Sequence, residues 1–176
     1  VYIRLTTAQT FQFSIKATPV DKLLWYFVEM SLFFGLVAGM LLLALFYNLA
    51  IGLKAKEPVY LYYAFYVFCN LLYSVISAGY CRLLFPEFNN LSLISNIATS
   101  LIILSAVMFC RQFLETRVTI PRFDVYLRAM IFFCFTAIIC SPFLNDFYAY
   151  ALAILIGIVS PVIALLAGIL SFRQGH

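Results

Sequence analysis

The side chains that could do chemistry are few in this sequence, and their spacing matches no known catalytic pattern. The five cysteines have no CxxC or Cys-His spacing, and the single histidine is His176. The sequence contains no HExxH motif, no glycine-rich phosphate loop and no evident nucleophile beside a base. We therefore expect no catalytic, cofactor-binding or metal-binding residues, and no enzymatic activity in this chain.

Three asparagines inside apolar runs are the next candidates. Asn48 lies near the end of the first run, whereas Asn70 and Asn96 lie deeper in the second and third. An amide in hydrocarbon needs a hydrogen-bond partner, so we expect bonds between helices that fix their register. For Asn48 we expect a bond to the helix that carries Tyr60 and Tyr63. A ligand or ion contact is the alternative.

Ionisable residues are nearly absent from the apolar runs. We expect Glu29 near the outer membrane interface, where it pairs with Lys22 or reaches lipid headgroups. No relay of buried Asp, Lys, Arg or His is evident in the runs, and charges at mid-membrane tend to mark ion pathways. A proton pump or an ion-coupled transporter is therefore disfavoured.

The composition predicts the elements that carry these side chains. Hydrophobic residues make up 65% of the 176 residues and charged residues 10%, whereas ordinary globular domains have about 25% charged residues. The apolar runs have the length that an α-helix needs to cross roughly 30 Å of hydrocarbon, and they lack the alternation of β-barrel strands. We expect an all-α membrane protein, a polytopic bundle in residues 23–176 with five transmembrane helices, at 23–53, 59–80, 91–109, 125–143 and 147–172.

Residues 1–18 show a different pattern. Apolar residues alternate with other residues at 1–5 and again at 11–15, which is the period of β-strands. Two strands alone are marginally stable in water. We expect the last hairpin of a larger extracytoplasmic β domain, followed by a linker at 19–22. Because the chain begins with Val1 and no signal-peptide pattern precedes its first helix, we interpret it as an internal fragment.

Basic residues near the helix ends predict the orientation. Seven lie on one side of the membrane and three on the other: Lys54, Lys56, Arg111, Arg117, Arg122, Arg128 and Arg173 against Lys16, Lys22 and Arg82. The positive-inside rule places the larger group in the cytoplasm, the N-terminus outside and residue 176 inside. The net charge of +4 is thus explained by topology, and we expect a lipid bilayer and no nucleic acid as partner.

Small residues at helical spacing predict close packing. Gly35 and Gly39 form a GxxxG motif in the first helix, which lets two helices approach closely in lipid. Packing within the chain and formation of a homodimer both explain the motif. In the fifth helix Ala164 and Gly168 repeat the spacing after Pro161, where proline predicts a kink.

An ordered string of short motifs is similar to one known family. Tyr47-Asn48 ends the first helix, a basic loop precedes Tyr60-Leu61-Tyr62-Tyr63, and Ser77-Ala78-Gly79 leads to Leu84-Phe85-Pro86. After the third helix comes a block that includes Phe113, Leu114 and Arg117, within Phe109-Cys110-Arg111-Gln112-Phe113-Leu114-Glu115-Thr116-Arg117. The string resembles bacterial seven-transmembrane receptors with diverse intracellular signalling modules, and Val1-Tyr2-Ile3-Arg4 resembles the closing strand of their extracellular β domain. Phe85 departs from the family, where tryptophan is common before the proline.

The resemblance implies a function. Two more helices would follow residue 176, and then a cytoplasmic output domain such as a diguanylate cyclase, histidine kinase or phosphatase. The chain would be the sensory region of a receptor in the bacterial inner membrane, with an extracytoplasmic ligand for which carbohydrate is one class the resemblance allows. We hypothesise that Phe113 and Arg117, in the loop of residues 111–128, convey or stabilise the signalling state. A transporter or channel bundle, or the membrane anchor of an enzyme, is the alternative.

Overall fold

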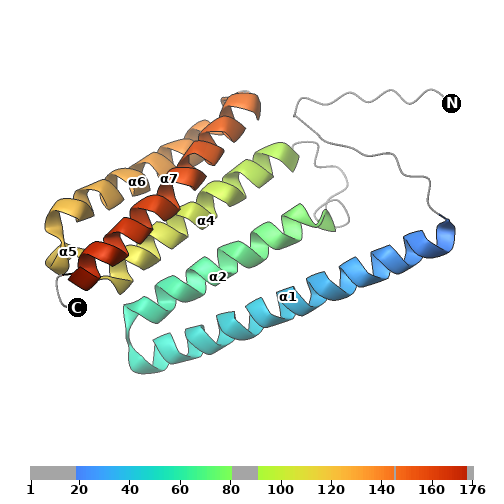
Figure 1. Ribbon diagram of the computed structural model, residues 1–176, viewed down its shortest axis with the longest axis horizontal. Coiled ribbons are helices and arrows are strands. Elements are labelled where there is room, and N and C mark those ends of the chain that lie inside the picture. The colour runs from blue at the N-terminus through green and yellow to red at the C-terminus, as the bar shows by residue number, and fades with distance from the viewer. Residues whose placement is uncertain (1–18, 81–90, 145, 174–176) are drawn as a thin grey trace.

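The computed structural model describes residues 19–80, 91–144 and 146–173 (Figure 1). The expected hairpin at 1–18 and the motif residue Pro86 lie outside these ranges. The described helices are α1 Val20–Ala55, α2 Pro58–Ser77, α4 Leu91–Phe113, α5 Thr116–Thr119, α6 Pro121–Cys140 and α7 Asp146–Arg173.

The prediction of an all-α, polytopic membrane protein is confirmed. Five of the described helices are long and apolar enough to cross a membrane, at Asp21–Ala55, Pro58–Ser77, Leu93–Phe113, Pro121–Cys140 and Ala151–Ile169. They correspond one to one to the five expected helices.

The helix ends differ from the predicted ends by several residues. Pro19 stands immediately before α1, so the helix includes most of the expected linker, and Pro121 is the first residue of α6, four residues earlier than expected. Proline suits the first helical turn because its missing N–H would have no helical partner there. Hydropathy marks only the apolar part of a helix, and these charged terminal turns lie beyond it.

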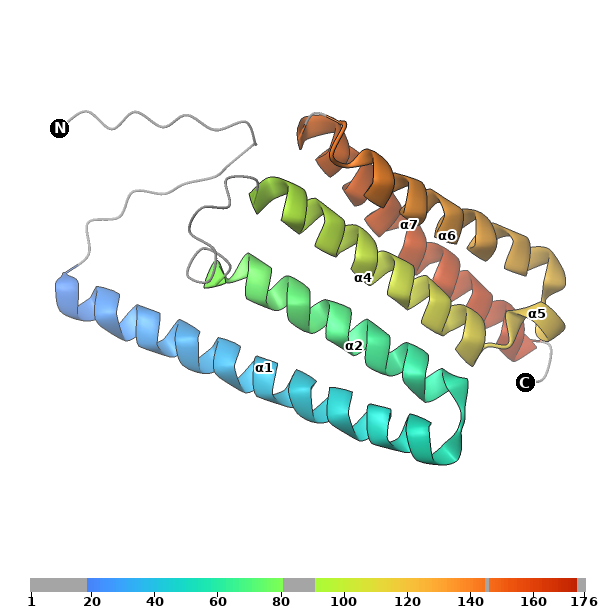
Figure 2. The same cartoon turned by 180° about the vertical axis from the view of Figure 1, so that it is seen from behind.

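The long helices form a sheaf in which α4 is central (Figures 1 and 2). It packs against α2 on one side and against α6 and α7 on the other, while α1 packs against α2 alone among the described helices. Buried side chains of α4, α6 and α7 form the hydrophobic core: Ile103, Leu104, Val107, Leu127, Cys134, Ala137 and Ile156. The hydrophobic core of the described chain therefore lies between α4, α6 and α7.

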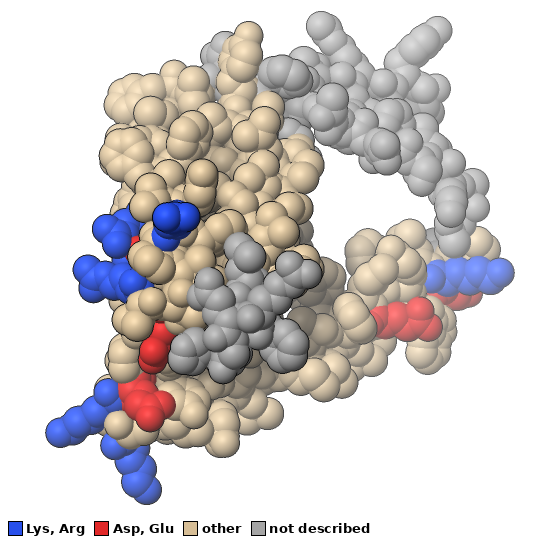
Figure 3. All heavy atoms as spheres, turned by 60° about the vertical axis from the view of Figure 1, so that its left-hand side comes forward, with Lys and Arg blue, Asp and Glu red and all other residues tan. Residues whose placement is uncertain are grey.

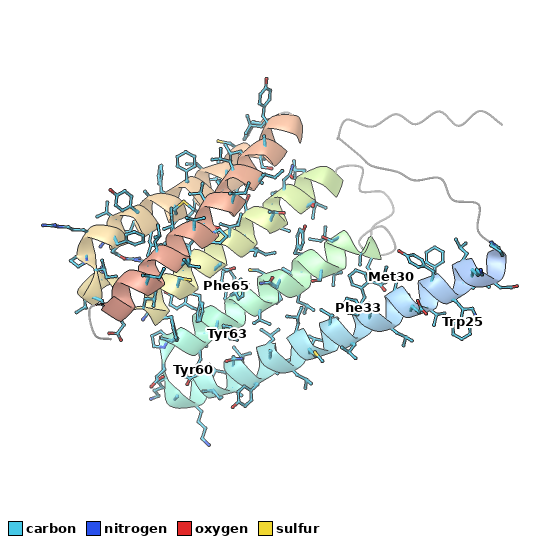
Figure 4. All side chains as sticks on the ribbon, in the orientation of Figure 1. Trp25, Met30, Phe33, Tyr60, Tyr63 and Phe65 are labelled. Carbon is cyan, nitrogen blue, oxygen red and sulfur yellow. The ribbon has the colours of Figure 1, made fainter. Side chains whose placement is uncertain are left out.

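Helix α1 is longer than a membrane span requires. Its 36 residues extend about 54 Å at 1.5 Å per residue, against roughly 30 Å of hydrocarbon. Its first turns run past the end of α2, where Trp25 has no helix beside it, and Phe33 lies close to that end (Figures 2 and 4). Their side chains are 69% and 64% exposed. From Phe34 onward α1 faces α2, since Phe34 lines a pocket together with Ser74 and Val75.

The α1–α2 hairpin closes tightly. Lys56 adopts a left-handed conformation with φ of 56°, Glu57 is extended, and Pro58 begins α2. Gly52 is buried, and a Cβ atom added to it would lie 2.9 Å from Leu61 Cδ2 and 3.2 Å from Tyr60 Cβ. A larger residue at position 52 would therefore have to displace the side chain of Leu61.

Candidate functional site

The best-defined polar structure lies at one end of the bundle, which we call the basic end. Here α1 turns into α2 and α4 turns through α5 into α6. Lys and Arg side chains gather over this end with acidic side chains between them, and a smaller charged group lies at the start of α1 (Figure 3). The exposed basic residues here include Lys54, Lys56, Arg117, Arg122 and Arg128.

The connection from α4 to α6 is a compact, hydrogen-bonded elbow. Glu115 takes a left-handed conformation with φ of 44° directly before α5. Its carbonyl accepts hydrogen bonds from the backbone N–H groups of Val118 and Thr119, at 2.8 and 3.1 Å. The Thr119 hydroxyl also donates to the Leu114 carbonyl at 3.2 Å. These bonds fix how α6 leaves α4.

Asp124 lies at the centre of this elbow. Its side chain is fully buried and accepts bonds from three residues on three helices. Arg111 at the end of α4 donates from Nε to Oδ1 at 2.6 Å and from Nη2 to Oδ2 at 3.2 Å. The Thr116 hydroxyl of α5 donates to Oδ1 at 2.9 Å. Arg128, one turn along α6, donates from Nε to Oδ2 at 2.7 Å.

The ion pair between Arg111 and Asp124 is more deeply buried than an ordinary surface ion pair. Thr116 is buried with Asp124, and the side chain of Arg111 is 27% exposed, whereas that of Arg128 is 56% exposed. Removing one partner of a buried pair leaves an uncompensated charge, at a cost of about 3–5 kcal/mol. The Arg111–Asp124–Thr116 contact therefore acts as the lock of the elbow, and Arg128 adds a weaker exposed contact.

A polar cavity of about 470 Å³ opens beside the elbow. Arg111 and Arg117 supply positive charge, Glu115 supplies a carboxylate, and Tyr62 brings a hydroxyl group from α2. Gln112 and Val118 complete the described lining. The lining of this cavity comes from both α2 and the elbow, and its side chains could bind a charged or polar group.

A row of aromatic rings connects α2 to α4 close to the same end. The ring of Tyr63 lies with its centroid 6.4 Å from that of Tyr66 and 5.3 Å from that of Phe109. Phe109 in turn stacks on Phe113 at 5.5 Å. Tyr63, singled out from the sequence, is thus a packing residue between two helices.

The two glycines of the GxxxG motif have open space at their Cβ positions. A Cβ atom added to Gly35 or Gly39 would meet no atom within 4 Å in the described chain. Packing within the chain and formation of a homodimer both stay predictions for this motif. The close approach that a glycine permits occurs at Gly52 instead.

The prediction that Asn48 forms a hydrogen bond to another helix is wrong. Its Nδ2 donates to the Ala44 carbonyl of its own helix at 2.7 Å, and Asn70 likewise donates to Tyr66 at 2.8 Å. A side chain on a helix reaches the carbonyl one turn back more easily than a neighbouring helix. Asn96 is buried, and its Nδ2 has no hydrogen-bond partner among the described residues.

The remaining motif residues do not form a single site. Tyr47 is 67% exposed on the outer face of α1, and Phe113 is 62% exposed. Gly79 has φ of 81°, a conformation that favours glycine, just after α2. Leu114 is half-buried in the elbow and Arg117 lines the polar cavity. Of these motif residues, Tyr60 meets Gly52 in the hairpin and the residues from position 113 onward belong to the elbow.

The sequence pattern did not identify Asp124 as a candidate site residue. It stands in a segment that the hydropathy pattern assigns to a loop, and its partner Arg111 is thirteen residues away. The available signal was the Asp124–Arg128 spacing of four residues after Pro121, which is typical of an ion pair in the first turns of a helix. That signal predicts the exposed contact but not the buried one.

The comparisons with known proteins agree with this architecture. A family model described as 7TM diverse intracellular signalling matches residues 30–176. No curated protein and no solved structure matches the chain significantly. The match covers α1 from Met30 onward and all the other described helices, including the Asp124 elbow. The chain is a multi-pass membrane region of a signalling receptor, and it belongs to the 7TM diverse intracellular signalling family.

Proposed function

We propose that this chain is the sensory membrane region that passes an extracytoplasmic signal to a cytoplasmic output domain beyond residue 176. In this proposal the basic end faces the cytoplasm, the N-terminus lies outside, and the membrane is the bacterial inner membrane. The charge asymmetry of the helix ends supports the orientation. The ligand is met by a β domain before residue 19 or within the bundle, and carbohydrate is the class we would test first.

The observation that carries the proposal is the locked elbow. Arg111, Asp124 and Thr116 join the ends of α4, α5 and α6, and α5 also contacts α7. The last described helix thus ends beside the lock. A signal that moves α4 against α6 must strain this contact, and α7 would carry the result onward.

Such transmission works by a population shift. A ligand changes the output only if it binds one helix arrangement more tightly than another. The lock would stabilise one of these arrangements, because its buried carboxylate needs Arg111 and Thr116 in place. Weakening it should change the basal output even without ligand.

The experiment measures the output of the full-length protein. The gene beyond codon 176 is sequenced first, and we expect further helices followed by a cyclase, kinase or phosphatase domain. Asp124→Asn is then compared with Arg122→Gln, an exposed residue of the same helix. We expect the first variant to change basal output severalfold at equal membrane expression and the second to leave it unchanged. An early stop codon, or equal output from both variants, would contradict the proposal.

The orientation has its own test. Single cysteines placed at Lys56 and at Leu24, in a protein whose native cysteines are replaced, are labelled in intact spheroplasts with an impermeant maleimide. We expect labelling at position 24 and, only after lysis, at position 56. The reverse pattern would place the basic end outside.

A further inference from the structure

The polar cavity of the basic end shares a lining residue with an apolar groove. Tyr62 lines both the cavity of about 470 Å³ and the groove of about 300 Å³. The other residues of the groove are Pro58, Leu61 and Phe65. The polar cavity and the apolar groove therefore meet at Tyr62 on α2.

The groove has the direction of a lipid chain. Pro58 is the first residue of α2 and Phe65 lies seven residues further along it. At 1.5 Å per residue the groove spans about 10 Å of the helix, from its end toward the middle of the span. Leu61 and Phe65 are both 39% exposed, so their side chains are open to an acyl chain from outside the protein.

The cavity has the donors for a phosphate group. Arg111 uses Nε and Nη2 to bind Asp124, and its Nη1 makes no hydrogen bond among the described residues. This pairing holds the guanidinium in place, whereas the side chain of Arg117 is exposed. Arginine forks bind phosphate through paired hydrogen bonds. The two arginines that line the polar cavity could therefore bind one phosphate group between them.

Glu115 sets a further condition on the ligand. Its carboxylate also lines the polar cavity and would repel a bare anion. It would accept a hydrogen bond from a hydroxyl group carried next to the phosphate. The polar cavity therefore fits a phosphodiester with a hydroxylated headgroup better than a simple phosphate.

We propose that this cavity and groove bind one anionic glycerophospholipid of the phosphatidylglycerol type. The phosphate lies between Arg111 and Arg117, the headgroup hydroxyl meets Glu115, and one acyl chain follows Leu61 and Phe65. The net positive charge of the basic end would concentrate such lipids around it. The proposed orientation enters only in assigning the lipid to the cytoplasmic leaflet.

The test uses the full-length protein in nanodiscs of phosphatidylcholine that contain a small fraction of spin-labelled phosphatidylglycerol. We expect an immobilised lipid component that Arg117→Gln weakens about tenfold in association constant, because the variant loses a charge-assisted hydrogen bond to the phosphate. Arg122→Gln is the matched control, because it removes an exposed charge from the same end without lining the cavity. Equal binding by these two variants would overturn the proposal.

A second pair of variants tests the groove. Phe65→Ala should weaken retention of the labelled lipid, and Phe68→Ala, at 41% exposure on the same helix but outside the groove, should not. Glycerol phosphate and inorganic phosphate are added as soluble competitors. If these displace the lipid label at millimolar concentration and Phe65→Ala has no effect, the ligand is a soluble phosphate and the lipid assignment is wrong. Binding is measured without the output, so either proposal can fail alone.

Discussion

Asp124 Oδ1 accepts a 2.6 Å hydrogen bond from Arg111 Nε and so joins the first turn of α6 to the last turn of α4. The carboxylate is fully buried and the guanidinium is only partly exposed. In a bundle whose other contacts are mainly apolar, this is the contact whose loss leaves a charge without a partner.

Replacing Asp124 should therefore destabilise the bundle strongly. We expect Asp124→Ala to lower the free energy of unfolding by about 3 kcal/mol, because Arg111 and Thr116 lose their shared acceptor. Unfolding in mixed detergent micelles, followed by circular dichroism, measures the change. Arg128→Gln is the control, since its half-exposed contact is worth at most about 1 kcal/mol. Equal losses in both variants would show that burial of the carboxylate is not the decisive factor.

Gly52 and Gly35 should respond differently to the same enlargement. A leucine at position 52 must displace Leu61 and press on Tyr60, whereas nothing lies within 4 Å of a Cβ atom at position 35. We expect Gly52→Leu to cost about 1–3 kcal/mol through overpacking. Gly35→Leu should be neutral or stabilising, because leucine favours helix more than glycine does. The same unfolding assay decides, and a larger loss at position 35 would point to a contact with another chain.

Asn48 and Tyr63 should behave independently. Asn48 donates to Ala44 in its own helix, and Tyr63 packs on Phe109. A double-mutant cycle of Asn48→Leu with Tyr63→Phe should be additive within about 0.5 kcal/mol. A larger coupling energy would restore the interhelical bond that the sequence suggested.

Tyr63 and Phe109, in contrast, should be coupled. Their ring centroids lie 5.3 Å apart across α2 and α4, a distance at which aromatic pairs contribute about 0.5–1.5 kcal/mol beyond simple burial. The cycle Tyr63→Leu with Phe109→Leu measures this energy. The cycle Phe68→Leu with Phe109→Leu serves as its reference, and equal values in both cycles would remove the special role of the Tyr63 ring.

Much of the fold followed from local pattern. Five apolar runs of helical length predicted five helices in the right order, because a backbone in lipid must satisfy its own hydrogen bonds. The predicted ends were displaced where charged turns continue a helix past its apolar part, as at Arg111. Tyr63 was predicted to bond with Asn48 of the first helix, but its ring packs on Phe109 of α4, and Asn48 bonds within its own helix.

The sequence by itself determined that this chain is a helical membrane protein and supplied the motif string whose resemblance predicted the family, because hydropathy and motif order are properties of neighbouring residues. Only the tertiary structure showed that Asp124 is buried against Arg111 and Thr116, and that Gly52 rather than Gly35 permits a close helix contact. Burial and partnership depend on how helices distant in sequence are rotated and packed against each other. A run of residues considered by itself does not determine how its helix is rotated against its neighbours.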